Sequence, residues 1–553
     1  MNNAFEPMEI DNSAEDGEDG PVDFEYCVVS RKQLEELLQR CVKCDRRPKN
    51  IGKQRRESGE TVPKRTISFT AKGSCITAGW YCPCNKSGKK KLHFSMQPFI
   101  EGTRTREGNL AIVAAMITTP IDYSSMLYFC KALRMPMFTE QSFHQLNRHY
   151  VNPVVMEHYA VMKQEVFTHV TMPLEIAMDG QYDSVGYSAE LECETAMDVK
   201  TGLVLTFTIS HKSEVEGISN RMEKLGAQKV IDELVENYEI DSATTDKHAG
   251  VIKMLGEKGI QTRFDLWHLL RLLGGSIRKT GKRLSDEDRK TLRMLARRLF
   301  SHIWHVIDLV AEDHPAHFVE LVYAFFSHVI GFHRWNVNVK LLDLVPAEPS
   351  TKFSRIAEIK RLKFEIVTTC PHDELDNFAT PPVPVNSPPL QLLLELLGKN
   401  AFISDIRKVY SKCATSALES FHSIRIRYCP KRKFFALRGL TVKTMLATMH
   451  WNTTRLAERK AVTMYESFSK ARGRNRLVTR KEVAEQGWKR KIVEKAVDRK
   501  LQYGPGAPDE DDVEQEEEEY DFNEDELVGQ LQALMLTDNE EEVDEEEVEE
   551  MDR

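Results

Sequence analysis

The spacing of hydrophobic residues changes along the chain and indicates where helices and strands lie. Apolar residues recur at helical intervals over residues 127–133 and 143–170, which predicts a helical region spanning residues 101–172. A turn-like segment at 134–139 separates the two stretches. The pair is compatible with a helix-turn-helix that contacts DNA and with a plain connector.

Between residues 173 and 265 the pattern becomes typical of a sheet covered by helices. The predicted strands are Leu174–Met178, Leu191–Asp198, Leu203–Ile209, Ser242–Thr245 and Ile260–Phe264, and the predicted helices are Ile218–Tyr238 and His248–Lys258. The Val-Lys-Thr-Gly run at 199–202 indicates a hairpin between the second and third strands. This order of elements predicts an α/β fold with a mixed sheet.

Residues 266–365 show helical spacing almost throughout, and six prolines between residues 371 and 389 then interrupt it. Helical spacing resumes at residue 390 and continues to about residue 500. We expect an all-helical segment at 266–400, a second α/β segment at 401–460 and a basic helical segment at 461–503. No stretch approaches the ~18 apolar residues of a membrane span, so none is expected.

The two ends of the chain are acidic and enclose a basic centre. Residues 1–26 hold nine acidic residues and no Lys or Arg, and residues 509–553 hold 24 acidic residues and one Arg. The net charge of −9 therefore leaves residues 27–508 with about +23, which suits a nucleic-acid partner. The ends, 1–26 and 504–553, are predicted to be disordered tails. Leucines at helical spacing in the second tail are compatible with docking a basic protein partner and with a solubilising role.

Two close cysteine pairs lie in the segment 27–100. Cys41 and Cys44 form one pair, and Cys82 and Cys84 form the other. Four thiolates on two turns can hold a structural Zn²⁺ in a zinc-ribbon-like module. Because the second pair is tighter than usual, Cys75 could replace one member, and the alternative is a group of reduced, partly buried thiols. Lysines within residues 86–91 add a basic surface suited to phosphates.

Two aspartates directly follow predicted strands, and a glutamate lies at the start of a predicted helix. Asp179 follows the strand at 174–178, Asp246 follows the strand at 242–245, and Glu419 is in the first turn of a helix that begins near residue 416. Strand ends in α/β sheets open onto the crevice where ligands bind. Three carboxylates there could hold two Mg²⁺ (or Mn²⁺) ions for phosphodiester chemistry, although such residues also form turns and helix caps.

Six short stretches occur in an order and spacing that match one family. They are Met178–Ser188, Met197–Gly202, Thr245–His248, Phe264–His268, Ala417–His422 and Tyr428–Arg432. From about residue 41 to residue 452, the chain resembles eukaryotic DDE-type DNA transposases of the Kolobok-like or Mutator-like kind. The resemblance implies an RNase H-like core interrupted by a helical insertion at 266–400. It also implies that Asp179, Asp246 and Glu419 are the catalytic metal ligands.

The resemblance draws attention to further residues around this triad. Asp265 and His268 resemble a family element that follows the second aspartate, with a role that is either structural or at the DNA end. His422 lies three residues after Glu419 on the same helical face, where it could orient the carboxylate or contact phosphate. Trp267 is expected in the core rather than stacked on a base.

The expected function is Mg²⁺-dependent cleavage and strand transfer of double-stranded DNA, at transposon ends or genomic sites. The lack of a secretion signal, the 11 cysteines and basic clusters at 431–433, 470–476 and 489–491 are compatible with a nuclear protein. The resemblance also implies a homo-oligomer. The alternative is a domesticated, catalytically inactive protein of transposase origin that binds DNA or chromatin, and the intact triad is compatible with both.

Overall fold

The structure is a computed structural model that describes residues 26–45, 47, 65–82, 84–85, 91–184, 189–307, 309–310, 315–346, 359–371, 382–409, 416–431, 433–460, 464–469, 474–479, 484 and 486–506. The predicted acidic tails, apart from a few residues at their inner ends, lie outside the described residues. So do residues 86–90, which hold three of the four lysines of the lysine-rich stretch, and residues 372–381, which hold one of the six prolines. None of the described helices is both long enough and apolar enough to cross a bilayer.

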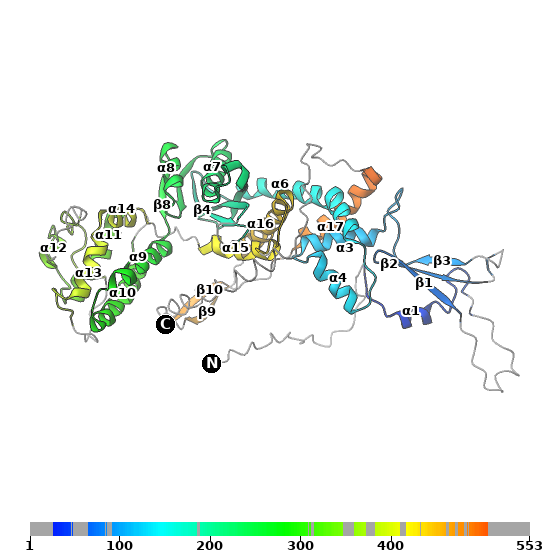
Figure 1. Cartoon of the computed structure of the whole chain (residues 1–553), viewed down its shortest axis with the longest axis horizontal. Coiled ribbons are helices and arrows are strands. Elements are labelled where there is room, and N and C mark those ends of the chain that lie inside the picture. Colours follow the sequence, from blue (N-terminus) through cyan, green and yellow to red (C-terminus); the bar gives the residue numbers. More distant parts are fainter. Residues whose placement is uncertain are drawn as a thin grey trace, which may run out of the picture. The chain divides into compact units, whose positions relative to one another are not determined.

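The chain divides into two compact units. The first consists of residues 1–154 and 489–509, and the second consists of residues 155–488 and 510–553. The first unit contains an antiparallel sheet of β1 (Ile67–Lys72), β2 (Cys75–Trp80) and β3 (Leu92–Ser95), preceded by the short helix α1 (Arg31–Leu37) (Figure 1). Leu38, Ala78 and Trp80 form a small core between α1 and the sheet.

Helices complete the first unit. They are α3 (Glu107–Thr118), α4 (Tyr123–Ala132), α5 (Glu140–Leu146), the π-helical turn Asn147–Val151 and, from far along the chain, α17 (Gly487–Tyr503) with the 3₁₀ turn Gly504–Gly506. Lys500 on α17 donates to the hydroxyl of Tyr150 at 2.6 Å, and that hydroxyl donates to the carbonyl of Gly504 at 2.7 Å. These buried contacts hold the C-terminal helix against the N-terminal helices.

The second unit is built on a mixed five-stranded sheet in the order β6-β5-β4-β7-β8. The strands are β4 (Leu174–Tyr182), β5 (Leu191–Asp198), β6 (Val204–His211), β7 (Ile240–Thr245) and β8 (Gln261–Phe264). β4, β5 and β6 pair antiparallel, whereas β4 pairs parallel with β7 and β7 pairs parallel with β8. The sheet confirms the predicted mixed α/β fold and the hairpin between β5 and β6.

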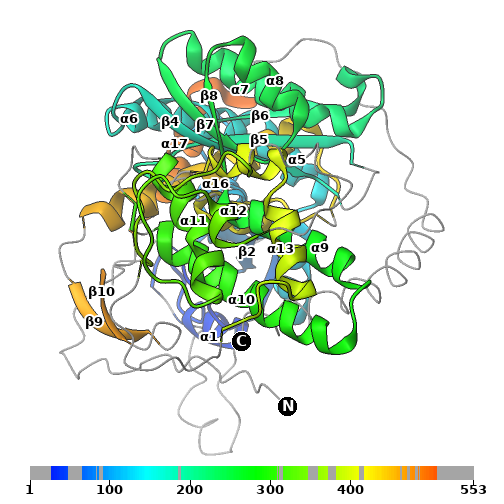
Figure 2. The ribbon, with the colours of Figure 1, turned by 90° about the vertical axis from the view of Figure 1, so that its left-hand side faces the viewer.

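Helices cover both faces of this sheet. They are α6 (Asn152–Phe167), α7 (Met222–Val235), α8 (Ala249–Glu257), α15 (Ser416–Tyr428) and α16 (Leu437–Lys460), with 3₁₀ turns at Lys212–Val215 and Ser219–Arg221. Figure 2 shows α7 and α8 on one side of the strands and α15 and α16 on the other. Because both faces are covered, all eight residues of β5 are buried.

Between β8 and α15 the chain forms a separate group of helices with its own core. The helices are α9 (Leu266–Gly281), α10 (Asp286–Ile307), α11 (Pro315–Val329), α12 (Leu341–Leu344), α13 (Pro388–Leu397) and α14 (Asn400–Ile406). Leu295, Leu299 and Val322 belong to the hydrophobic core that these helices share. The chain then rejoins the sheet, where Val409 bridges to Phe264 at the end of β8.

Three predicted boundaries are wrong, each for a physical reason. β4 continues past Met178 to Tyr182 because β5 supplies backbone hydrogen-bond partners as far as Tyr182. The predicted helix at 461–503 instead contains the hairpin β9 (Met464–Ser469) and β10 (Arg474–Thr479), in which each strand gives the other its backbone partners. In the stretch 266–365, predicted to be helical almost throughout, the last long helix ends at Val329. Gly331 then adopts a positive φ of 92° and turns the chain.

Asn452 on α16 forms hydrogen bonds with the backbone of the edge strand β6, and these bonds provide a test of the packing. Its fully buried side chain accepts from the amide of Val204 and donates to the carbonyl of Val204, both at 2.9 Å. We predict that Asn452→Ala lowers the free energy of unfolding by roughly 2–3 kcal/mol, because two buried backbone groups lose their partners. Chemical denaturation measures this, with Thr453→Ala on the same helix as the control. Equal values for the two variants would contradict the role of Asn452.

Candidate functional site

Asp179 lies inside β4 rather than directly after it, which corrects the sequence-based placement. It pairs with Thr195 of β5, whereas the pairing of β4 with β7 ends at Ala177 and Thr244. β4 therefore extends beyond its parallel neighbour. Asp179 lies at the level where β7 ends and gives way to Asp246. Parallel pairing thus brings the two aspartates to the same end of the sheet. Ligands of α/β sheets bind at this end, outside the carboxyl ends of the parallel strands.

We call Asp179, Asp246 and Glu419 the carboxylate site. Two histidines contact these three carboxylates. Nε2 of His268 is 3.4 Å from Oδ1 of Asp246 and 3.9 Å from Oε1 of Glu419. Nδ1 of His422 is 3.3 Å from Oδ2 of Asp179. The structure therefore brings together the triad, His268 and His422 from three separate parts of the sequence.

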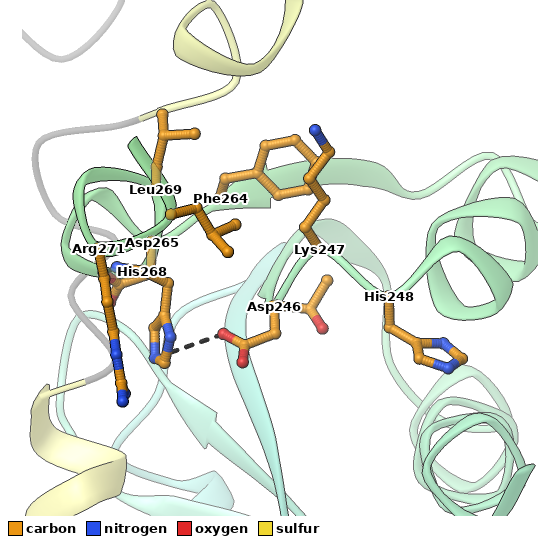
Figure 3. A pocket seen from close by; sticks show the side chains of 10 residues that line it. Asp246, Lys247, His248, Phe264, Asp265, His268, Leu269 and Arg271 are labelled. Atoms are coloured by element: carbon orange, nitrogen blue, oxygen red, sulfur yellow. Dashed lines mark hydrogen bonds and ion pairs between the residues drawn. The ribbon is translucent and has the colours of Figure 1, made fainter. Parts of the chain in front are cut away.

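The start of α9 explains the position of His268. Asp265 caps this helix, because its carboxylate accepts from the backbone amides of Trp267 and His268 at 2.5 and 3.3 Å. Asp265 is buried, and its cap directs His268 toward Asp246 (Figure 3). A structural role is thus sufficient to account for Asp265.

Trp267 is not in the core, contrary to the sequence-based expectation. Its side chain is 44% exposed, and the guanidinium of Arg271 lies 5.3 Å from its ring centre. The apolar stripe of α9 passes through Leu266, Leu269 and Leu270, which leaves the neighbouring Trp267 on the solvent side of the helix.

An open cavity of about 410 Å³ leads to Asp246. Its lining includes Lys247, His248, His268 and Arg271, and Figure 3 shows His268 facing the Asp246 carboxylate while Lys247 and His248 point away from it. Burial raises the pKa of Asp246, the His268 imidazole opposes this shift, and the neighbouring carboxylates of Asp179, Asp265 and Glu419 raise the pKa further. Such mutual repulsion indicates that the site is arranged to accept a cation.

A buried pair of glutamates, which sequence reasoning missed, lies behind the carboxylate site. Glu192 and Glu194 on β5 are 0% and 2% exposed, and burial raises the pKa of each well above its usual range. They fill the space left by two glycines, since a Cβ on Gly180 or Gly226 would approach Oε atoms of Glu192 to 2.7 or 2.5 Å. Acidic residues alternating along a strand usually indicate a solvated face, so the sequence held no signal for this burial.

The four predicted zinc ligands form one group in the first unit. The Sγ atoms of Cys41 and Cys84 are 3.7 Å apart, as are those of Cys44 and Cys82. A tetrahedral Zn²⁺ with bonds of about 2.3 Å places its sulfur ligands about 3.8 Å apart, so the spacing fits a metal. Cys75 lies outside the group. Burial raises the pKa of Cys41, but interactions with Trp80 and the backbone of residues 43 and 44 lower it to about 6, which favours a thiolate.

Comparison with known proteins identifies the family. A family model described as Mutator-like transposase matches residues 25–335. The chain belongs to the Mutator-like transposase family. The match includes Asp179, Asp246 and the cysteine group, whereas Glu419 and His422 lie beyond it. No curated protein and no solved structure matches the chain.

The buried glutamate pair predicts a specific dependence of stability on pH. Because the folded-state pKa values are raised, the pair's contribution to stability is complete below the unfolded pKa of about 4.3 and is lost as the pH rises through the folded values. We predict that Glu192→Gln, which stays neutral, shows a smaller fall in unfolding free energy between acidic and neutral pH than the wild type. Chemical denaturation at both pH values measures this. The exposed Glu190→Gln serves as the control and should follow the wild type.

The cysteine group predicts one equivalent of tightly bound zinc. We expect Cys44→Ser to lose that metal and to lower the melting temperature, because a structural zinc site contributes directly to folding. Elemental analysis of the purified full chain measures the metal. Cys27→Ser changes an exposed cysteine outside the group and should keep the zinc. Full zinc content in the Cys44 variant would contradict the assignment.

Proposed function

We propose that this chain cleaves and joins double-stranded DNA at a DDE site made by Asp179, Asp246 and Glu419. The single observation that carries the proposal is the convergence of three carboxylates from β4, the end of β7 and α15, held by His268 and His422. Membership of a transposase family adds a nucleic-acid substrate to this geometry. The sheet would then be an RNase H-like core, and helices α9 to α14 would be its insertion.

The oxygen ligands of the carboxylate site suit Mg²⁺ or Mn²⁺. Asp179, Asp246 and Glu419 would hold the ions, and a bound cation would relieve the repulsion among the carboxylates that raises the pKa of Asp246. When bound, two such ions activate the attacking oxygen and neutralise the leaving one. His268 and His422 would keep the carboxylates in place through their nitrogen contacts. The Asp265 cap would hold His268 at the start of α9.

Other groups would position the DNA. Lys247 and Arg271 line the cavity beside Asp246 and suit backbone phosphates. The exposed indole of Trp267 lies on the same helical turn as His268 and suits stacking against a base. We further propose that the zinc-bound cysteine group stiffens a DNA-contacting module, and that the protein acts in the nucleus as a homo-oligomer. A basic partner for the acidic tail also belongs to this proposal.

The second candidate function is that of a domesticated DNA-binding protein without cleavage. The observation that favours it is the low acidity of Asp246, since burial and all three neighbouring carboxylates, Asp179, Asp265 and Glu419, raise its pKa. The two functions share DNA binding and differ in metal-dependent chemistry, so one assay separates them.

We predict that the wild-type protein nicks and joins DNA from its own gene's flanks only with Mg²⁺ or Mn²⁺. Asp179→Asn combined with Asp246→Asn should reduce both activities to background, because the ions lose two charged ligands, while DNA binding persists. Gel analysis of labelled duplex measures the products. Asp241→Asn, an exposed aspartate on β7, is the matched control. DNA binding by the wild type without any metal-dependent cleavage would favour the domesticated alternative.

A further inference from the structure

A second cavity, of about 390 Å³, lies between α10 and α11 and shares no residue with the carboxylate site. We call it the α10–α11 pocket, and its lining consists of Arg297, Arg298, Ser301, His302, Phe325 and His328. The lining contains two arginines, two histidines and no acidic residue. Nothing in the proposed cleavage chemistry uses this pocket.

Arg298 is the group in this pocket that needs an explanation. One terminal nitrogen, Nη2, is 3.4 Å from Nε2 of His328, while the other, Nη1, is buried and has no hydrogen-bond partner within the described chain. No carboxylate of the described residues forms an ion pair with it. Burial lowers the pKa of Arg298. A guanidinium that is partly withdrawn from water and faces no anion among the described residues is unfavourable, so an added anion would stabilise it.

The helix that carries Arg298 is basic over a long distance. From residue 289 to residue 307, α10 contains five basic residues and no acidic one. Arg289, Arg293 and Arg297 repeat every fourth residue and so lie on one helical face, about 6 Å apart along the axis. An extended row of this kind suits a polyanion better than a compact anion.

A metal ion is the competing occupant of this region. Nitrogen and sulfur atoms of His328, His333 and Cys370 lie within 4.8 Å of one another, and such a set can bind Zn²⁺. The guanidinium of Arg298 contacts Nε2 of His328, however. A Zn²⁺ ion bound to His328 would therefore be repelled by the positive charge of Arg298. The same charge attracts an oxyanion. The charge distribution therefore favours an anion over a dication.

We propose that the α10–α11 pocket binds a phosphoryl oxyanion, with the half-buried Arg298 as its main donor and the exposed Arg297 and Ser301 on the solvent side. The planar guanidinium can donate two parallel hydrogen bonds to phosphate oxygens. The row of arginines on α10 makes a nucleic-acid backbone the natural source of that phosphate. Only the nucleic-acid source of the phosphate rests on the proposed DNA function. The pocket itself does not, because a free phosphoryl compound offers the same oxygen atoms to the arginine.

The test uses the full chain and the variant Arg298→Met, which keeps the packing of the side-chain stem and removes the charge. Thermal unfolding and the affinity for a short DNA duplex at two salt concentrations are measured. We expect an unchanged or higher melting temperature, together with roughly tenfold weaker DNA binding. The salt dependence should decrease by about one phosphate contact. Lys290→Met is the matched control, since Lys290 is an exposed cation on the same helix that lies outside both the pocket and the arginine row.

A second arm identifies the source of the phosphate. If pyrophosphate stabilises the wild type and not the Arg298 variant while DNA binding is unaffected, the pocket binds a free phosphoryl compound. A lower melting temperature with unchanged binding of both probes would overturn the inference and assign Arg298 a structural role. A second zinc equivalent that is lost in Cys370→Ser would overturn it as well. Because Asp179→Asn leaves the pocket intact, failure of DNA cleavage is distinguishable from failure of this site.

Discussion

The buried hydrogen bonds of Arg425 are the interactions on which the arrangement of the carboxylate site depends. Its buried side chain, on α15, donates to the side-chain oxygen of Gln181 on β4 at 2.7 Å and to Thr444 on α16 at 3.1 Å. Gln181 lies two residues after Asp179, while Glu419 and His422 precede Arg425 on the same helix. One buried guanidinium thus joins the strand that carries the first aspartate to the helix that carries the glutamate. That bond adds to the packing of the buried Leu418 and Phe421 and to the histidine contacts in fixing the third carboxylate relative to the sheet.

The surroundings of the acidic groups divide them into two kinds. Asp179, Asp246 and Glu419 remain partly exposed beside histidines, so their oxygens stay accessible to a ligand from solvent. Glu192 and Glu194 are enclosed between β4 and α7, and burial raises the pKa of both, which favours their neutral forms. The distinction follows from burial rather than from residue type, because desolvation is what penalises the charged form.

Chain order and spatial order differ in both units. In the first, α17 from the C-terminal region packs against the residues around Tyr150, which lie some 350 positions earlier. In the second, a whole helical group with its own core separates β8 from α15. The parallel bridge between Phe264 and Val409 closes that excursion, so the sheet is restored at the point where the chain left it. The helical group therefore carries the α10–α11 pocket on elements that are separate from the mixed sheet.

The sequence by itself determined the strands of the mixed sheet, because short apolar runs and the Val-Lys-Thr-Gly turn are local signals. It also pointed to the triad, through the ordered motifs of the family resemblance, and to the two cysteine pairs, since closely spaced cysteines are visible in one dimension. It could not determine that Asp179 lies within β4, because strand length depends on the partner strand. The burial of Glu192 and Glu194, the exposure of Trp267 and the hairpin at 464–479 also escaped it. Only the tertiary structure decided these, since burial and strand pairing depend on which distant segments come to cover a residue.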